Sequence, residues 1–177
     1  SQRVAEYAQA IAEEMDLPND QVEMVRMAGR LHDIGKIGMS NELLLKPGRF
    51  GLEEFEQFKQ HPTIGAQLVN SFRLFEEGTH LIRHHHERYD GTGYPSGLAG
   101  EEIPLGSRIL AIADSFDAMT SRRVYRPAMS FDEAIAELVA NKGTQFDPEI
   151  VDVFIDILRR RRRPVIAPTV DPVAHRT

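Results

Sequence analysis

The sequence predicts an all-α protein, a compact bundle of about seven to nine helices. Apolar residues recur at helical spacing along most of the chain, and helix-capping patterns stand between these stretches. No convincing alternation of apolar and polar residues indicates a strand. The 177 residues suffice for one domain with a substantial hydrophobic core.

Five helices are predicted in the first half of the chain. The first begins at the first residues, and Pro18 ends it, so that a second starts at Asn19. Ser40 caps a short third helix. Leu52, Phe55 and Phe58 share one face of the fourth, and a proline near the start favours the fifth. The predicted ranges are 1–15, 19–31, 40–45, 52–58 and 61–71.

In the second half of the chain, four helices are predicted around one long loop. A helix is expected over 79–87, and the glycines and prolines of 90–106 indicate a long ordered loop. Apolar residues from Ile109 to Met119 predict the next helix. Ser130 and Glu133 form a capping box before another. Asp147 followed by Pro148 starts the last helix, which carries apolar residues as far as Leu158.

Composition excludes several classes of protein. The absence of cysteine rules out disulfides, thiolate zinc sites, Cys-ligated iron–sulfur clusters and a Cys nucleophile, and it fits a reducing, cytoplasmic compartment. No apolar stretch is long enough to span a membrane, and no secretory leader opens the chain. The net charge of −6 argues against a general nucleic-acid binder.

The charge is unevenly distributed. Before Arg159 there are 15 basic and 26 acidic residues, a formal charge of −11. From Arg159 onward, six arginines and one aspartate give +5. We therefore divide the chain into an acidic folded domain, residues 1–158, and a basic tail, residues 159–177, which we expect to be disordered. Contact of this tail with a membrane surface or with nucleic acid is a minor alternative.

The histidines gather in one part of the chain, since six of the seven lie between His32 and His86. His32 and Asp33 are adjacent at the end of a predicted helix, where both could bind one metal, or could form a surface pair. A carboxylate there could also bridge two cations. His61 stands at a predicted helix start, where a structural hydrogen bond is the alternative to a ligand.

Two further segments could complete a metal site. His84, His85 and His86 follow one another within the predicted 79–87 helix, so at most two can face one site. A polar, solvated turn is the alternative reading. Asp114 interrupts an apolar helix and needs a partner, which could be a metal or a basic side chain.

Together these residues form a nitrogen and oxygen ligand set that suits Fe, Mn or Zn in a multinuclear hydrolytic site. Two cations bridged by a carboxylate would serve phosphoester hydrolysis. Lys36 follows the first ligands, and Arg122, Arg123 and Arg126 follow the Asp114 helix, where they could bind a small anionic substrate or simply end a helix.

At this point the sequence resembles the HD-GYP domain, a branch of the HD metal-dependent phosphohydrolases. Four segments carry most of the resemblance, which covers nearly all of residues 1–158: His32-Asp33-Ile34-Gly35-Lys36, His61-Pro62-Thr63-Ile64-Gly65, His85-His86-Glu87-Arg88 and Asp90-Gly91-Thr92-Gly93-Tyr94-Pro95-Ser96-Gly97-Leu98. Residues 103–108 and 143–148 extend it. The resemblance implies an HD-type helical bundle with a long ordered GYP loop.

The resemblance also implies a site. The metal ligands would be His32, Asp33, His61, His85, His86 and Asp114, holding two or three divalent ions, with Fe or Mn favoured and Asp33 as the bridge. His84 is the less favoured candidate. Asp33 and Lys36 would be catalytic, and Lys36, Tyr94, Arg123 and Arg126 would bind substrate.

There are two departures from the family pattern. The family has a further ligand, a histidine, just before the Arg-Val that matches Arg3-Val4, and some members have an upstream glutamate. We expect the histidine upstream of Ser1, lost by truncation of the first helix. The family often reads Arg-Pro-Tyr where this chain has Arg123-Val124-Tyr125.

The implied activity is hydrolysis of the bacterial second messenger cyclic di-GMP to pGpG and GMP. A phosphodiesterase for another cyclic dinucleotide is one alternative. A catalytically weak regulatory module that binds a nucleotide or a GGDEF-type protein is another. The resemblance further implies an upstream sensory or receiver domain and contacts with GGDEF-domain proteins, and a homodimer is also considered.

Overall fold

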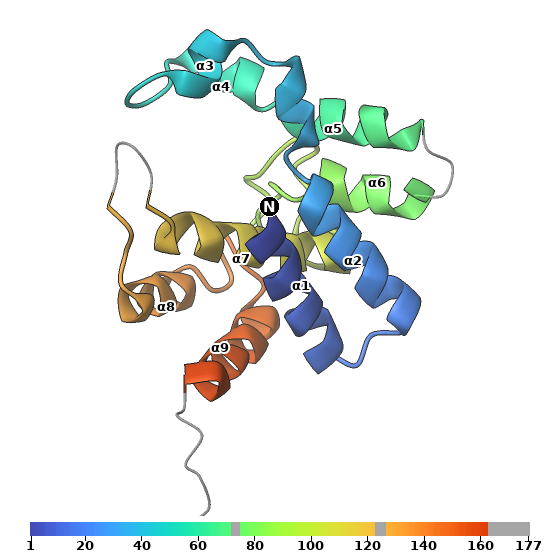
Figure 1. The fold of residues 1–177 in the computed structure, drawn as a ribbon, viewed down its shortest axis with the longest axis vertical. Helices are drawn as coiled ribbons and strands as arrows, with labels where there is room; N and C mark the ends of the chain where they lie inside the picture. The colour runs from blue at the N-terminus through green and yellow to red at the C-terminus, as the bar shows by residue number, and fades with distance from the viewer. Residues whose placement is uncertain (72–74, 123–126, 163–177) are drawn as a thin grey trace, which may run out of the picture.

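The computed structural model describes residues 1–71, 75–122 and 127–162, and within these ranges it consists of helices joined by turns and loops, without a strand. Figure 1 shows the helices gathered in one bundle, from which α3 and α4 project at one end. The α-helices are α1 (Gln2–Glu14), α2 (Asn19–Leu31), α3 (Asn41–Leu45), α4 (Leu52–Phe58), α5 (His61–Asn70), α6 (Glu76–Arg83), α7 (Leu105–Thr120), α8 (Phe131–Ala140) and α9 (Pro148–Arg162). The described residues also form the 3₁₀ helices η1 (Ile34–Gly38) and η3 (Gly100–Glu102). The predicted all-α class is confirmed.

The core lies around α1, which packs against α2, α7 and α9. The apolar residues that predict the first helix are buried here, with Ala8 and Ile11 at 0% exposure. Phe116 of α7 contacts the rings of Tyr7, Phe131 and Phe154 edge to face, at centroid distances of 5.4, 5.8 and 5.2 Å. This packing ties four helices together and fixes the position of α7, which carries Asp114.

The segment of α3 and α4, residues 41–58, is called the outer lobe below. Leu43 is its one side chain in the buried class among these residues, all of which the structure describes. The predicted shared face of Leu52, Phe55 and Phe58 exists on α4, yet Leu52 remains 89% exposed. The remaining helices, α1, α2 and α5–α9, are called the body below. Helical periodicity in α4 does not lead to burial against this body.

Local signals placed several helix ends correctly. Ser40 accepts a hydrogen bond from the Leu43 amide at the start of α3. Ser130 and Glu133 form the predicted capping box of α8. The Asp147 carboxylate accepts from the amides of Glu149 and Ile150 at the start of α9. These three ends are confirmed because each depends on residues close in sequence.

Two predicted boundaries were wrong. The helix expected over 79–87 spans 76–83, so His84, His85 and His86 form a turn after α6 and are not helical. The loop expected over 90–106 is shorter, because it contains η3 and ends where α7 begins at Leu105. The carbonyl of Pro104 accepts the amide hydrogens of Ser107 and Arg108 and so starts α7 earlier than the apolar pattern indicates.

Helix α9 extends to Arg162, so the last turn consists of the arginines with which the predicted tail begins. The rest of that tail, residues 163–177, lies outside the described residues. Within the described part of the chain, no helix has both the length and the apolar character needed to cross a membrane.

Candidate metal centre

Four segments bring the predicted ligands to the middle of the molecule (Figure 1). They are the C-terminal end of α2 with η1, the N-terminal end of α5, the turn after α6, and the middle of α7. Helix α2 packs on α6 and α7, and α5 packs on η1 and α6. All six predicted ligands therefore come together; they are His32, Asp33, His61, His85, His86 and Asp114.

Three of the four histidines are held in the same way. The Nδ1 atoms of His32, His61 and His85 lie 2.7, 2.8 and 2.6 Å from the backbone carbonyl oxygens three residues earlier. A carbonyl oxygen only accepts, so in the neutral rings Nδ1 carries the hydrogen and Nε2 keeps its lone pair. This arrangement orients a histidine toward a metal.

The Nε2 atoms of these rings face the site. Those of His61 and His85 are buried and lack a hydrogen-bond partner among the described residues. His61, His85 and His86 each offer a ring nitrogen, and the three nitrogens lie within 4.8 Å of one another. A buried acceptor without a partner is costly, which a bound cation would relieve.

Asp33 lies between the two halves of the cluster. Its Oδ2 lies 3.5 Å from Nε2 of His32, and its Oδ1 lies 3.6 Å from Nε2 of His61. On the other side, Asp114 Oδ1 lies 3.5 Å from the same Nε2 of His32. One carboxylate thus faces both a His32–Asp114 pair and the three-histidine group, which is the geometry that a bridging ligand needs.

Burial keeps three of the imidazoles neutral. Complete burial lowers the pKa of His85 to about 3, with the charge of His32 adding to the effect. Burial also lowers the pKa of His61, and the pKa of His86 falls well below its usual value through burial and the neighbouring His85. Because only the neutral ring binds a metal, these side chains are in the binding form at neutral pH.

For His32 and the two aspartates, charged partners outweigh burial and favour the charged form of each side chain. Burial lowers the pKa of His32, but the hydrogen bond that its ring donates to Asp114 and the charges of Asp33 and Asp114 outweigh it and leave this pKa raised. Burial raises the pKa of Asp33, yet the charges of His32 and Lys36 and the hydrogen bond of Lys36 leave it lowered. Burial likewise raises the pKa of Asp114, yet the hydrogen bond and charge of His32, with the charges of His85 and His86, leave it lowered. Both aspartates are therefore ionised at neutral pH and available as ligands.

A close backbone contact positions Asp33 against His61. A Cβ added to Gly35 of η1 would lie 1.9 Å from the carbonyl oxygen of His61 and 2.5 Å from the amide nitrogen of Gly65. Gly35 falls within the HD motif and Gly65 within the His-Pro motif. Only a residue without a side chain allows η1 to lie this near to α5.

Sequence reasoning did not single out Glu87, which anchors the loop of residues 90–99. Its carboxylate is buried and accepts hydrogen bonds from the amides of Ser96, Gly97 and Leu98 at 2.7, 3.0 and 3.2 Å. It also lies 3.2 Å from Nδ1 of His84. The signal was present as an acidic residue directly between the histidine run and the glycine-rich loop.

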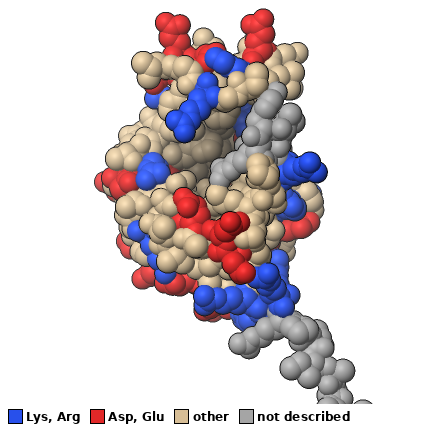
Figure 2. Space-filling view, turned by 90° about the vertical axis from the view of Figure 1, so that its left-hand side faces the viewer, with Lys and Arg blue, Asp and Glu red and all other residues tan. Residues whose placement is uncertain are grey.

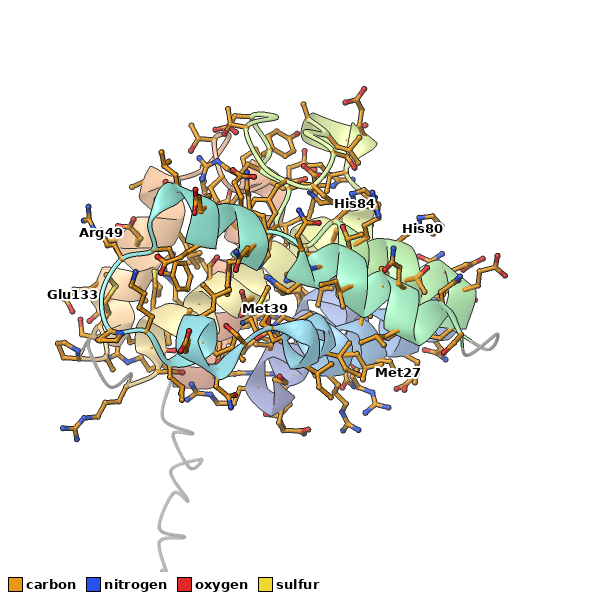
Figure 3. All side chains as sticks on the ribbon, turned by 90° about the horizontal axis from the view of Figure 1, so that it is seen from above. Met27, Met39, Arg49, His80, His84 and Glu133 are labelled. Atoms are coloured by element: carbon orange, nitrogen blue, oxygen red, sulfur yellow. The ribbon has the colours of Figure 1, made fainter. Side chains whose placement is uncertain are left out.

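His84 accordingly has a structural partner and stands apart from the three-histidine group. Figure 3 labels it at the end of α6, one turn after the exposed His80. The expectation that at most two consecutive histidines face one site agrees with the placement of His85 and His86 in that group. The reason differs from the one expected, because the three residues occupy a turn and not a helix.

The predicted substrate-binding residues are placed in part. Lys36 Nζ lies 2.7 Å from Asp33 Oδ2, and the Tyr94 ring lies 5.0 Å from that of His86. Burial, with the charges of Asp114 and Asp33, raises the pKa of Tyr94, so its phenol stays protonated. Arg123 and Arg126 lie outside the described residues. Arg122 is exposed at the end of α7.

The site is open on one side, since the side chains of Asp33 and Asp114 are 33% and 28% exposed. Figure 2 shows the surface hollowed beneath the outer lobe, with basic side chains on the upper rim. An N/O donor set with unpartnered Nε2 atoms, ionised aspartates and an opening to solvent fits divalent cations of the first transition row.

The chain was compared with known proteins. A family model described as HD domain matches residues 1–150. The chain is 44% identical over 156 residues to the cyclic di-GMP phosphodiesterase response regulator RpfG of Xanthomonas campestris, covering 87% of this chain and 41% of that protein. It is 42% identical over 171 residues to a cyclic di-GMP phosphodiesterase of Thermotoga maritima, covering 92% and 46%. It is 40% identical over 149 residues to the 3'3'-cGAMP-specific phosphodiesterase 3 of Vibrio cholerae, covering 84% and 32%.

The chain spans less than half the length of these relatives. A solved structure with the same fold is that of Bd1817, an HDG"Y"P protein from Bdellovibrio bacteriovorus. Its TM-score is 0.71 at 21% identity, over 89% of this chain and 51% of that one. The chain belongs to the HD-domain family, and its motifs are those of the HD-GYP branch.

Proposed function

We propose that this member of the HD-domain family, of the HD-GYP type, is a metal-dependent phosphodiesterase that hydrolyses cyclic di-GMP to pGpG and GMP. The observation that carries the proposal is the six-residue cluster of His32, Asp33, His61, His85, His86 and Asp114. Backbone carbonyls orient three of its four histidines, His32, His61 and His85. Ring nitrogens of His61, His85 and His86 lie within 4.8 Å of one another. The curated phosphodiesterases at 42–44% identity support the choice of substrate.

Two metal positions follow from the donor groups. His61, His85 and His86 would hold one ion, His32 and Asp114 the other, and Asp33 would contact both. Fe or Mn is favoured by this donor set, and a third ion remains part of the proposal. When bound, such ions supply Lewis acidity that activates water and stabilises the charge on a phosphoryl group.

The chain's own residues would bind and orient the phosphate. Lys36 balances the charge of Asp33, at 2.7 Å, and can offer its remaining donors to a phosphate oxygen. Tyr94 is a neutral phenol beside His86 and can donate a hydrogen bond to the same group. Arg123 and Arg126 are proposed as further phosphate donors because they follow the Asp114 helix in sequence.

A second candidate substrate is 3'3'-cGAMP. The identity of 40% to a phosphodiesterase specific for that nucleotide favours it, since it falls close to the 42–44% of the cyclic di-GMP enzymes. Metal and phosphate contacts are the same for both nucleotides, so the cluster alone cannot select between them. The regulatory-module alternative is less well supported because all six predicted ligands converge.

The test uses the full-length protein, loaded anaerobically with Fe(II) or Mn(II). Metal content is measured by elemental analysis, and turnover of cyclic di-GMP and of 3'3'-cGAMP by chromatography. We expect two or more ions per chain and hydrolysis of cyclic di-GMP. Full metal occupancy without turnover of either nucleotide would refute the enzymatic proposal.

Asp33→Ala is the matched variant. Loss of the carboxylate that faces both halves should lower the metal content and abolish turnover. The control is His80→Gln, because His80 is exposed on α6 and outside the cluster. Unchanged metal content in Asp33→Ala would contradict the bridging role.

We further propose a cytoplasmic setting, an upstream sensory or receiver domain and GGDEF-type partners, as is implied by the resemblance. A homodimer is also part of the proposal. These assignments rest on family likeness and not on a contact in the described residues.

A further inference from the structure

Helix α4 carries aromatic side chains that the packing of the body does not use. Every residue of α4 is exposed or half-buried, and Phe55 is 42% exposed. Burying a phenylalanine stabilises a fold, so a large ring left in solvent forgoes that gain. The ring is therefore available to contact a ligand.

Phe55 lies next to the candidate metal centre. Its ring centroid is 6.1 Å from that of Tyr94, with the two planes at 83°. Tyr94 in turn lies 5.0 Å from His86, one of the three grouped histidines. Phe55 is thus one ring further from the cluster than Tyr94, on the side of the outer lobe.

Cations accompany the aromatic side chains of α4. Lys59 Nζ lies 5.4 Å from the centroid of Phe55, and Lys36 Nζ lies 5.4 Å from that of Phe58. The Phe58 ring also lies 4.8 Å from the ring of His61. Rings for stacking beside cations for phosphate are the combination by which proteins bind single nucleotides without base pairing.

We propose that Phe55 stacks on a purine base of the cyclic dinucleotide and so contributes to substrate affinity. This inference rests on the proposed function. In a cyclic dinucleotide, each base is attached through one sugar to the phosphates of a small ring. A phosphate held at the cluster therefore places a base at the rim of the same site, where the hollow beneath the outer lobe opens (Figure 2).

A protein partner is the competing use of this surface. The outer lobe also exposes Leu45 and Leu52, at 72% and 89%. Phe55 differs from these residues because its ring reaches Tyr94 and, through it, the cluster. The observations therefore assign Phe55 to the substrate and leave the two leucines without that role.

The test compares Phe55→Leu with Phe55→Tyr in the metal-loaded full-length protein. Leucine keeps an apolar side chain but has no π face, whereas tyrosine keeps the face. We measure KM and kcat for cyclic di-GMP, and by calorimetry the Kd of its non-hydrolysable phosphorothioate analogue. For Phe55→Leu we expect KM and Kd to rise about 5- to 150-fold, the range typical of one stacked base, with kcat within about twofold. Phe55→Tyr should retain most of the affinity.

Leu52→Ala is the control, since it removes an exposed apolar side chain from the same helix. Its KM and Kd should match those of the wild type. Wild-type KM and Kd in Phe55→Leu, or an equal loss in Phe55→Leu and Phe55→Tyr, would overturn the stacking role while leaving the phosphodiesterase in place. A metal-loaded wild type that neither binds the analogue nor hydrolyses cyclic di-GMP would remove both proposals.

Discussion

The helical body and the outer lobe carry similar apolar spacing but use it differently. In α1 the residues Val4, Ala8 and Ile11 are at most 1% exposed, because three helices surround them. In the lobe, Leu45 and Leu52 point largely into solvent. The same periodicity that makes a core in one place makes an exposed surface in the other.

The difference assigns the two regions separate tasks. The proposed metal ligands lie on α5 and α7 or follow the ends of α2 and α6, and these helices pack closely on their neighbours in the body. Their positions are therefore fixed by the core and by backbone carbonyls. The lobe projects at one end of the bundle (Figure 1), and its Phe55 ring lies beside Tyr94 of the site, which suits contact with a substrate.

The largest effect is expected in the body, from Phe116→Ala. The ring is 1% exposed and contacts Tyr7, Phe131 and Phe154. Its removal leaves a cavity among four helices and should lower the free energy of unfolding by about 3–5 kcal/mol. Urea unfolding in the presence of a chelator measures this loss. A value below about 1 kcal/mol would contradict the role of Phe116 in holding the four helices of the core together.

The next effect is expected from Glu87→Ala, at the boundary between body and site. The substitution leaves the amides of Ser96, Gly97 and Leu98 without their acceptor. We expect a loss of about 2–3 kcal/mol, since hydrogen bonds to a charged group contribute more than those between neutral groups. The ordering of Tyr94 and His86 should suffer too, so metal affinity should fall.

Glu102→Ala serves as the matched control for Glu87. Among the described residues, that carboxylate accepts only from the amide of Ala99, at 3.2 Å, and Glu102 is exposed. Its loss should cost less than about 1 kcal/mol. If both variants behave alike, the anchoring role of Glu87 is wrong.

The next effect is expected from pH. Acidification from pH 7.5 to 5.5 should lower the free energy of unfolding of the chelator-treated protein by about 1–2 kcal/mol. The pKa of His85 is lowered to about 3, and those of His61 and His86 are also lowered. For these rings the unfolded state binds protons first, so their stabilisation is present above pH 6.5 and is lost as the pH falls toward their folded pKa values.

His32 opposes this trend, because its raised pKa contributes stability below pH 6.5 that is lost at higher pH. Three lowered pKa values outweigh one raised value, so the net change on acidification is destabilising. Urea unfolding at several pH values measures it. His80→Gln, at an exposed position, should show the same dependence of stability on pH as the wild type. A free energy of unfolding that rises toward pH 5.5 would contradict the lowered pKa values of the three histidines.

The smallest effect is expected in the outer lobe, from Leu52→Ala. Because the side chain is 89% exposed, the free energy of unfolding should change by less than about 0.5 kcal/mol. The same urea experiment as for Phe116→Ala gives the comparison directly. A loss of 2 kcal/mol or more would mean that the lobe is part of the core.

Predictions from sequence were best where one short segment contains all the interacting groups. Ser130 with Glu133, and Asp147 with Pro148, define helix starts through bonds between residues at most three apart. The histidine Nδ1 bonds to carbonyls three residues earlier are equally local, and they orient His32, His61 and His85 wherever the fold places them. Motif spacing identified the family for the same reason.

Predictions failed where contacts between residues far apart in the sequence determine the local conformation. The turn of His84, His85 and His86 was expected to be helical, but Glu87 binds amides about ten residues on, and Tyr89 and Asp90 bond to the carbonyls of Gln145 and Thr144. These contacts draw the chain out of the helix after Arg83. Similarly, the apolar face of α4 indicates burial, and only the course of the neighbouring helices leaves it exposed.

The sequence by itself thus determined the all-α class, most helix starts, the family and the donor types of the site, because short-range hydrogen bonds and residue chemistry suffice for these. The tertiary structure alone decided which atoms meet. It placed Asp33 between His32 and His61, turned His84 away to Glu87, and set Phe55 beside Tyr94. Such pairings depend on how helices far apart in the chain pack together, which no local pattern encodes.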